Sequence, residues 1–175
     1  MENKQRFIDD EIWMLTFSAA FQRANVYLLG ADEREKMHLK NMLKDYIKDF
    51  LLTQYQEEVS DEQHIVNIKD IKNYSEHFAH ILNNGNFSFG VSQKILNLYL
   101  KYQWCLGYLK STPPHFPVDR RIQNELRIKN IVSWTTEMGE LEYLNIIKIA
   151  REKLKQFNFE NIASLELALF ERNNY

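Results

Sequence analysis

The sequence predicts an all-α protein, with residues 1–175 forming a single compact domain of roughly six to eight helices around a central apolar helix at about 91–108. Apolar residues recur at three- and four-residue spacing through most of the chain, which is typical of helices with one buried face. Side chains that favour helix starts precede several of these segments. No segment alternates apolar and polar residues for long enough to predict a β-strand.

The first half of the chain predicts three helices. Residues 7–29 begin with acidic side chains, which are favourable at the positive end of a helix, and Gly30 is suited to end them. Asp32 is a typical capping residue, so a second helix is expected over 32–51. A third helix is expected over 60–81, where isoleucines and aromatic residues recur at helical spacing.

The fourth predicted helix begins at Ser88 or Val91, ends near Tyr108 and is apolar nearly all round, which is typical of a buried helix. Its central apolar residues are expected in the core: Ile95, Leu98, Tyr99 and Tyr102. One narrow polar stripe interrupts the apolar surface, and it consists of Lys94, Asn97, Lys101 and Cys105. Burying an ammonium group without a partner costs several kcal/mol, so Lys94 and Lys101 must face a cleft or meet carboxylates.

All three prolines lie within residues 111–117, which therefore predict a loop. This loop is expected to be exposed and to present His115 and Phe116 beside Asp119. The remaining helices are predicted at 119–129, 132–137, 140–155 and 161–170.

The charge and hydropathy of the sequence limit which classes of function are possible. The formal net charge of −2 excludes a uniformly basic nucleic-acid coat, although residues 91–130 carry seven Lys or Arg against two Asp or Glu. This local excess permits an anion-binding face. The sequence has no apolar run of 18 residues and starts with a polar, acidic segment, so we expect a cytoplasmic protein without a membrane partner.

Few side chains fit a metal or cofactor site. A single cysteine, Cys105, excludes a four-cysteine zinc site or iron–sulfur cluster. His77 and His80 have a spacing that can chelate a metal on one helical face, but no third ligand is evident nearby. Cys105 itself is expected to be a small packing residue instead of a nucleophile. We therefore expect neither a metal nor another cofactor.

Two motifs in one stretch carry a family resemblance. Gly90-Val91-Ser92-Gln93-Lys94 opens the central helix, and Pro117-Val118-Asp119-Arg120-Arg121-Ile122 follows the proline loop. With this ordered pair, residues 78–127 resemble the helix-hairpin-helix DNA glycosylase and abasic-site lyase superfamily, in particular its 8-oxoguanine branches.

The resemblance implies specific roles for these residues. Lys94 would be the nucleophile that attacks the sugar of a damaged deoxynucleotide, and Asp119 would stabilise the developing cationic sugar and steer protons. Gly90 and Val91 would direct backbone amides toward a DNA phosphate. Basic residues near the site would neutralise further phosphates: Lys101, Arg120, Arg121, Arg127 and Lys129.

Other functions remain open on the sequence. Lys94 and Asp119 can instead form a structural ion pair between packed helices. The chain would then be a non-catalytic nucleic-acid-binding module, of the kind that phages and mobile elements encode as accessory proteins, or a helical protein-interaction or oligomerisation module. The distance between the Lys94 ammonium and the Asp119 carboxylate, and the presence of a cleft beside them, separate these hypotheses best.

Overall fold

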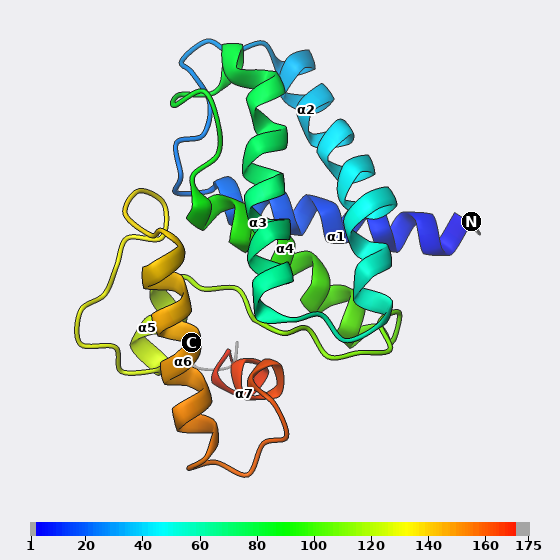
Figure 1. Cartoon of the computed structure of the whole chain (residues 1–175). Coiled ribbons are helices and arrows are strands. Elements are labelled where there is room, and N and C mark those ends of the chain that lie inside the picture. The colour runs from blue at the N-terminus through cyan, green and yellow to red at the C-terminus, as the bar shows by residue number, and fades with distance from the viewer. Residues whose placement is uncertain (1–2, 171–175) are drawn as a thin grey trace.

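The computed structural model describes residues 3–170, and this range contains helices and loops but no β-strand, which confirms the all-α prediction (Figure 1). The α-helices are α1 (Asn3–Phe21), α2 (Glu33–Tyr46), α3 (Asp61–Ser75), α4 (Phe89–Cys105), α5 (Arg120–Glu125), α6 (Glu140–Leu154) and α7 (Ile162–Leu169). Shorter helical segments are η1 (Ile47–Leu51, a π-helix) and the 3-10 helices η2 (Leu52–Gln56) and η3 (Glu76–Ile81). None of the described helices has the length and apolar character needed to cross a membrane.

Side-chain caps begin five of these helices, where the sequence favours them. The capping residues are Asp32, Ser60, Ser88, Asp119 and Asn161. Ser88 Oγ, for example, accepts the amide hydrogen of Val91 at 3.2 Å and so fixes the start of α4. Each cap satisfies a backbone donor that has no partner inside its own helix.

Helix α4 is the central element, and it packs against both α1 and α3. Figure 1 shows α1 to α4 together in one part of the molecule, with α5, α6 and α7 gathered at its lower left. The buried apolar cluster is continuous across both parts and includes Trp13, Tyr99, Tyr143 and Ile162. Trp13 of α1 stacks on Tyr99 of α4 with ring centroids 4.0 Å apart.

The helix expected at 7–29 ends earlier, at Phe21. The following segment turns at Asn25, whose φ of 43° lies in the left-handed region. It then runs beside the end of η3, where the Leu28 amide donates to the Ile81 carbonyl at 2.9 Å and Asn83 donates to Val26 at 3.0 Å. These long-range backbone bonds satisfy groups that a longer α1 would have used internally.

The short helix expected at 132–137 is absent, and turns occupy this segment. The Gln123 side chain binds both backbone groups of Val132, donating to its carbonyl and accepting from its amide at 2.9 Å each. Trp134 is buried, and its carbonyl oxygen lies so close to Gly90 that a Cβ there would be 1.6 Å away. Contacts with α4 and α5 therefore override the local helical pattern.

The core prediction for α4 is correct for two of its four residues. Ile95 and Tyr99 expose 0% and 1% of their surface, whereas Leu98 and Tyr102 are half-buried and line a cavity. The helix is thus enclosed on most sides but has one face along an open space.

Because Ile95 is enclosed and Leu98 is not, replacing each with alanine should lower the free energy of unfolding by different amounts. Ile95→Ala should lower the free energy of unfolding by about 2–5 kcal/mol, because it leaves a void in a closed core. Leu98→Ala should cost less than half as much, because Leu98 already adjoins a cavity. Urea denaturation of the two variants measures both costs, and equal losses would contradict the cavity.

Candidate functional site

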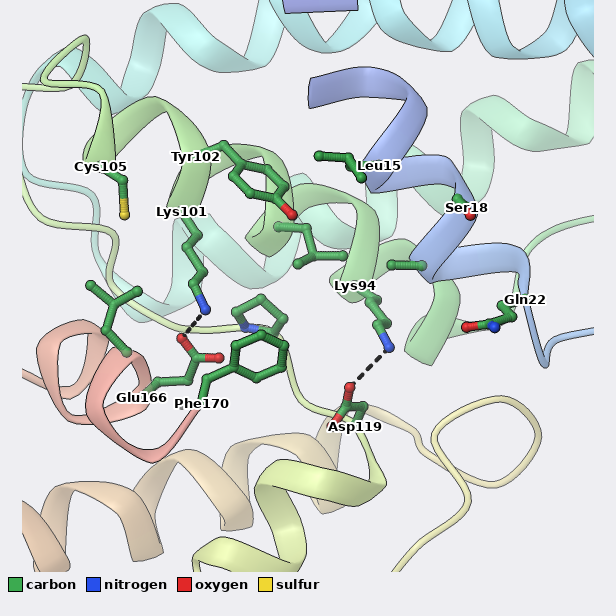
Figure 2. Close-up of a pocket in the computed structure, with 14 residues that line it drawn as sticks. Leu15, Ser18, Gln22, Lys94, Lys101, Tyr102, Cys105, Asp119, Glu166 and Phe170 are labelled. Atoms are coloured by element: carbon green, nitrogen blue, oxygen red, sulfur yellow. Dashed lines mark hydrogen bonds and ion pairs between the residues drawn. The ribbon is translucent and has the colours of Figure 1, made fainter. Parts of the chain in front are cut away.

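The cavity lies between α1, α4, α7 and the segment that leads into α5, and it has a volume of about 540 Å³ (Figure 2). Leu15 and Ser18 of α1, with Gln22 just after its end, form one wall, and most of the remaining lining is apolar. Charged side chains enter it from α4, α7 and the start of α5: Lys94, Lys101, Asp119 and Glu166. A cavity of this size with few polar groups is typical of a small-molecule site.

Lys94 and Asp119 meet at this cavity. Lys94 Nζ lies 3.0 Å from Asp119 Oδ2, and 9% of the lysine side chain and 22% of the aspartate side chain are exposed. The other carboxylate oxygen, Oδ1, accepts the Ile122 amide at 3.1 Å and thereby caps α5. One carboxylate thus holds both a helix start and the ammonium group, so its position beside the lysine is fixed.

An aromatic ring completes the surroundings of Lys94. The ammonium nitrogen lies 4.2 Å from the centre of the Trp134 ring. A cation over the face of an indole ring is attracted by the electron density of the ring. Asp119 and Trp134 therefore satisfy the requirement that the sequence imposes on a buried lysine.

Lys101 forms the second ion pair of the cavity. Its Nζ lies 2.6 Å from Glu166 Oε2, and the Phe170 ring centre is 4.4 Å from the same nitrogen. Glu166 exposes 3% of its surface, and burial raises the pKa of its carboxyl group, although Lys101 opposes this shift. Figure 2 shows both lysines reaching from α4 toward their carboxylate partners on the opposite wall.

The two ion pairs balance the formal charge of the cavity lining. A free phosphate would find no lining cation without a carboxylate partner. The apolar and aromatic walls instead suit a flat, neutral ligand such as a base. Cys105 lies at the same cavity, and burial raises the pKa of its thiol, which disfavours the reactive thiolate form.

Gly90 and Val91 lie in the first turn of α4. Both residues are buried, the Val91 amide donates to Ser88, and the backbone of Trp134 covers Gly90. The role of these two positions in directing amides toward DNA stays a prediction, and their burial gives it no support. Gly90 has a packing role instead, because any larger residue would collide with the 131–135 segment.

The predicted basic residues lie in three different surroundings. Lys101 lies inside the cavity, paired with Glu166. Arg121 is half-buried with its guanidinium 4.7 Å from the Phe170 ring centre. The other predicted cations are exposed outside the cavity: Arg120, Arg127 and Lys129.

The loop at 111–117 is not the exposed connector that its prolines predict. His115 exposes 1% of its surface and Phe116 exposes 2%, and neither lines the cavity. His115 Nε2 lies 3.0 Å from Asp61 Oδ1, and its Nδ1 lies 3.1 Å from the Tyr143 hydroxyl. The prolines thus hold the loop inward, where His115 joins a buried polar network.

The backbone of Val118 determines the orientation of that network. Gln93 Oε1 accepts the Val118 amide at 3.1 Å, so the Asn97 group facing this oxygen at 3.2 Å is the amide NH₂. Asn97 Oδ1 then faces His64 Nε2 at 3.0 Å, which assigns the proton to that nitrogen. His64 Nδ1 accordingly accepts from the Tyr55 hydroxyl at 2.7 Å.

The same orientation continues to the protein surface. The Asn97 NH₂ donates to the Tyr143 hydroxyl at 2.8 Å, and that hydroxyl donates to His115 Nδ1. The proton of His115 is therefore on Nε2 and is donated to Asp61. Arg151 is the last member of this series of hydrogen bonds, and it donates two of them to the Asp61 carboxylate. Every link is satisfied with both histidines neutral.

Burial favours this neutral state. It lowers the pKa of His115 to about 4, against the opposing effect of Asp61, and it lowers the pKa of His64 well below the ordinary value of 6.5. Hydrogen bonds from Arg151 are the largest cause that lowers the pKa of Asp61 to about 2. At neutral pH the network thus holds two neutral imidazoles beside one ion pair.

The histidines considered for a metal do not form a site. His77 Nδ1 lies 2.8 Å from the Tyr74 carbonyl oxygen, and His80 Nε2 lies 3.3 Å from Glu35 Oε2. Within residues 3–170 no group of three His, Cys, Asp or Glu side chains is placed to hold a metal ion.

Four residues of the site were not identified from the sequence: Gln93, Trp134, Glu166 and Phe170. Glu166 did have a signal, because it is the one charged residue in the apolar stretch 162–169. Gln93 and Trp134 had none, since their partners lie far away along the chain.

No protein-family model matches this sequence, and no match was found among curated proteins or among solved structures.

The network predicts a stability that falls in mild acid. Because the pKa of folded His115 is about 4 against 6.5 in the unfolded chain, the unfolded chain binds more protons between these values. Stability should therefore fall below about pH 6.5, and His115 alone should cost roughly 1–2 kcal/mol between pH 7 and pH 5. His64, whose pKa is also lowered, adds a loss over the same range. Asp61 adds its own loss only below its ordinary pKa of 3.8. Urea melts at several pH values measure the slope.

A matched pair of variants tests the assignment to His115. His115→Gln keeps one donor and one acceptor but does not titrate, so it should reduce the slope to the part that His64 contributes. The exposed His77 provides the control, and His77→Gln should leave the slope unchanged. A slope that His115→Gln does not alter would show that the network does not control acid stability.

Proposed function

We propose that this protein is a DNA N-glycosylase and abasic-site lyase that acts through an imine formed by Lys94. One observation carries the proposal: the Lys94 ammonium lies 3.0 Å from the Asp119 carboxylate on the wall of an open cavity of about 540 Å³. A purely structural ion pair needs no such cavity. The resemblance of the Gly90–Lys94 and Pro117–Ile122 segments to the glycosylase superfamily supports the same assignment.

Lys94 acts as the nucleophile. Once neutral, its nitrogen attacks C1′ of a nucleotide placed in the cavity, and the bond from C1′ to the base breaks. The electrons of that bond leave with the base, which takes up a proton. The nitrogen then loses a proton, the bond from C1′ to the ring oxygen breaks, and that oxygen takes up a proton, which gives the imine. Removal of a C2′ proton forms a C2′–C3′ double bond as the 3′ phosphate leaves, and this elimination cleaves the strand.

Asp119 is positioned to move the protons. A general base must lie within hydrogen-bond reach of the proton it removes, and the 3.0 Å separation from Lys94 Nζ satisfies this condition. Its Oδ1 bond to Ile122 keeps the carboxylate in place while Oδ2 acts. The same negative charge favours the positive charge that develops on the sugar.

The groups beside Lys101 in the cavity suit a base turned out of the DNA stack. Glu166 and Phe170 both line the cavity, and enzymes of this kind hold the extruded base by hydrogen bonds and aromatic contacts. The balanced charge of the lining favours a neutral base over a phosphate. The DNA backbone would then remain outside the cavity.

Borohydride trapping tests the proposal. The protein is incubated at low salt, where phosphate contacts are strongest, with duplexes that contain oxidised, deaminated or abasic sites. Borohydride should reduce the imine and leave the protein covalently attached to DNA. Asp119→Asn should slow base excision about 10²-fold or more.

Two lysine variants provide the controls. Lys94→Arg keeps a cation beside Asp119 and should preserve the fold, yet it should abolish trapping because guanidinium does not form the imine. Lys101→Arg alters the other cavity lysine and should retain trapping. If no substrate is trapped or cleaved by the wild-type protein, Lys94 and Asp119 are a structural pair, and the chain is a helical binding module.

A further inference from the structure

A second hollow lies next to the Lys94 cavity. It is a groove of about 320 Å³ lined by residues that include Arg23, Arg120, Ser133, Trp134 and Thr135. We call it the Arg23–Arg120 groove. Trp134 connects it to the candidate site, because this residue lines the groove while its ring lies 4.2 Å from Lys94 Nζ. Any strand that places a sugar beside Lys94 passes close to this groove.

Two arginines from separate parts of the chain converge here. Arg23 follows the end of α1, and Arg120 is the first residue of α5. Both are exposed, and neither forms an ion pair with another residue in the range 3–170. The lysines of the cavity differ in this respect, since each has a carboxylate partner. The groove therefore has the unpaired positive charge that the cavity lacks.

The remaining polar groups suit an oxyanion. Ser133 and Thr135 both line the groove, and Ser133 Oγ lies 3.2 Å from Thr135 Oγ1, which brings two hydroxyl groups together. Glu137 is the one acidic residue among those lining the groove, and its Oε2 accepts the Ser133 amide at 3.3 Å. Guanidinium groups bind phosphate oxygens through paired, charge-assisted hydrogen bonds, and hydroxyl groups add donors.

We propose that the Arg23–Arg120 groove binds a backbone phosphate of the DNA strand whose sugar enters the Lys94 cavity. This inference rests on the proposed function. It assigns the base to the charge-balanced cavity and the phosphate to the cationic groove, with Trp134 between the two. Arg23 is then a DNA-binding residue although it lies about seventy positions before Lys94 in the sequence.

The test separates binding from catalysis. Fluorescence anisotropy measures the affinity for a labelled duplex containing a tetrahydrofuran abasic analogue, which has no C1′ oxygen and therefore cannot form the imine. Arg23→Gln and Arg120→Gln should each weaken binding severalfold and reduce the slope of log K against log salt by about 1. Glu137→Gln should tighten binding, because it removes the only negative charge among the groove residues.

Arg34→Gln is the matched control, since Arg34 is exposed at the start of α2, far from α5 in Figure 1. It should retain wild-type affinity and salt dependence. Affinities of Arg23→Gln and Arg120→Gln that equal that of Arg34→Gln would overturn the proposal, as would a wild-type protein that does not bind the duplex at low salt.

The outcome also distinguishes the groove from the proposed chemistry. Arg23→Gln should lower the trapped fraction most at limiting abasic duplex, and the deficit should shrink as the duplex concentration rises, because the variant weakens affinity. Weakened binding by the arginine variants without any trapping by the wild type would uphold the groove and reject the lyase. Trapping by the wild type with unchanged affinity in both arginine variants would do the reverse.

Discussion

Two buried glutamines hold the segments that build this site, and each does so with the same arrangement. Gln93 donates to the Val118 carbonyl at 2.7 Å and accepts the Val118 amide at 3.1 Å. Gln123 binds both backbone groups of Val132 in the same manner. A primary amide thus replaces the pairing that a neighbouring strand would provide, which lets irregular segments lie against helices with their polar groups satisfied. Loss of Gln93 would leave the buried backbone groups of Val118 without partners, at about 1–3 kcal/mol each.

The hydrogen bonds of Gln93 also position the candidate site, because the bonded residues are next to the site residues in the sequence. Gln93 precedes Lys94 and Val118 precedes Asp119, so the hydrogen bonds between Gln93 and Val118 bring the next residue of each segment together. The Gln123–Val132 pair then places Trp134 over the Lys94 ammonium. Through Asn97, Gln93 also orients the network that joins α3, α4, the proline loop and α6. The stability of the fold and the geometry of the candidate site therefore depend on the same contacts.

The sequence contains much of this fold but only part of the site. Helix positions and caps such as Asp32 and Ser88 depend on local propensity, which sequence patterns report directly. The sequence also predicts that Lys94 and Lys101 need partners, because an apolar helix cannot bury two ammonium groups alone. The inward position of His115 and the turn at 132–137 cannot be predicted from local sequence, because contacts with distant residues determine them. The same is true of the choice of Glu166 and Trp134 as partners of the two lysines.

The central claim is that Lys94, among all the amines of the protein, forms the covalent link to the sugar. Peptide mapping by mass spectrometry, after borohydride reduction of a complex with an abasic oligonucleotide and nuclease digestion, locates that link directly. The account predicts a deoxyribose-derived adduct on the peptide that contains Lys94. An adduct on Lys101 or on the amino terminus, with Lys94 unmodified, would contradict it.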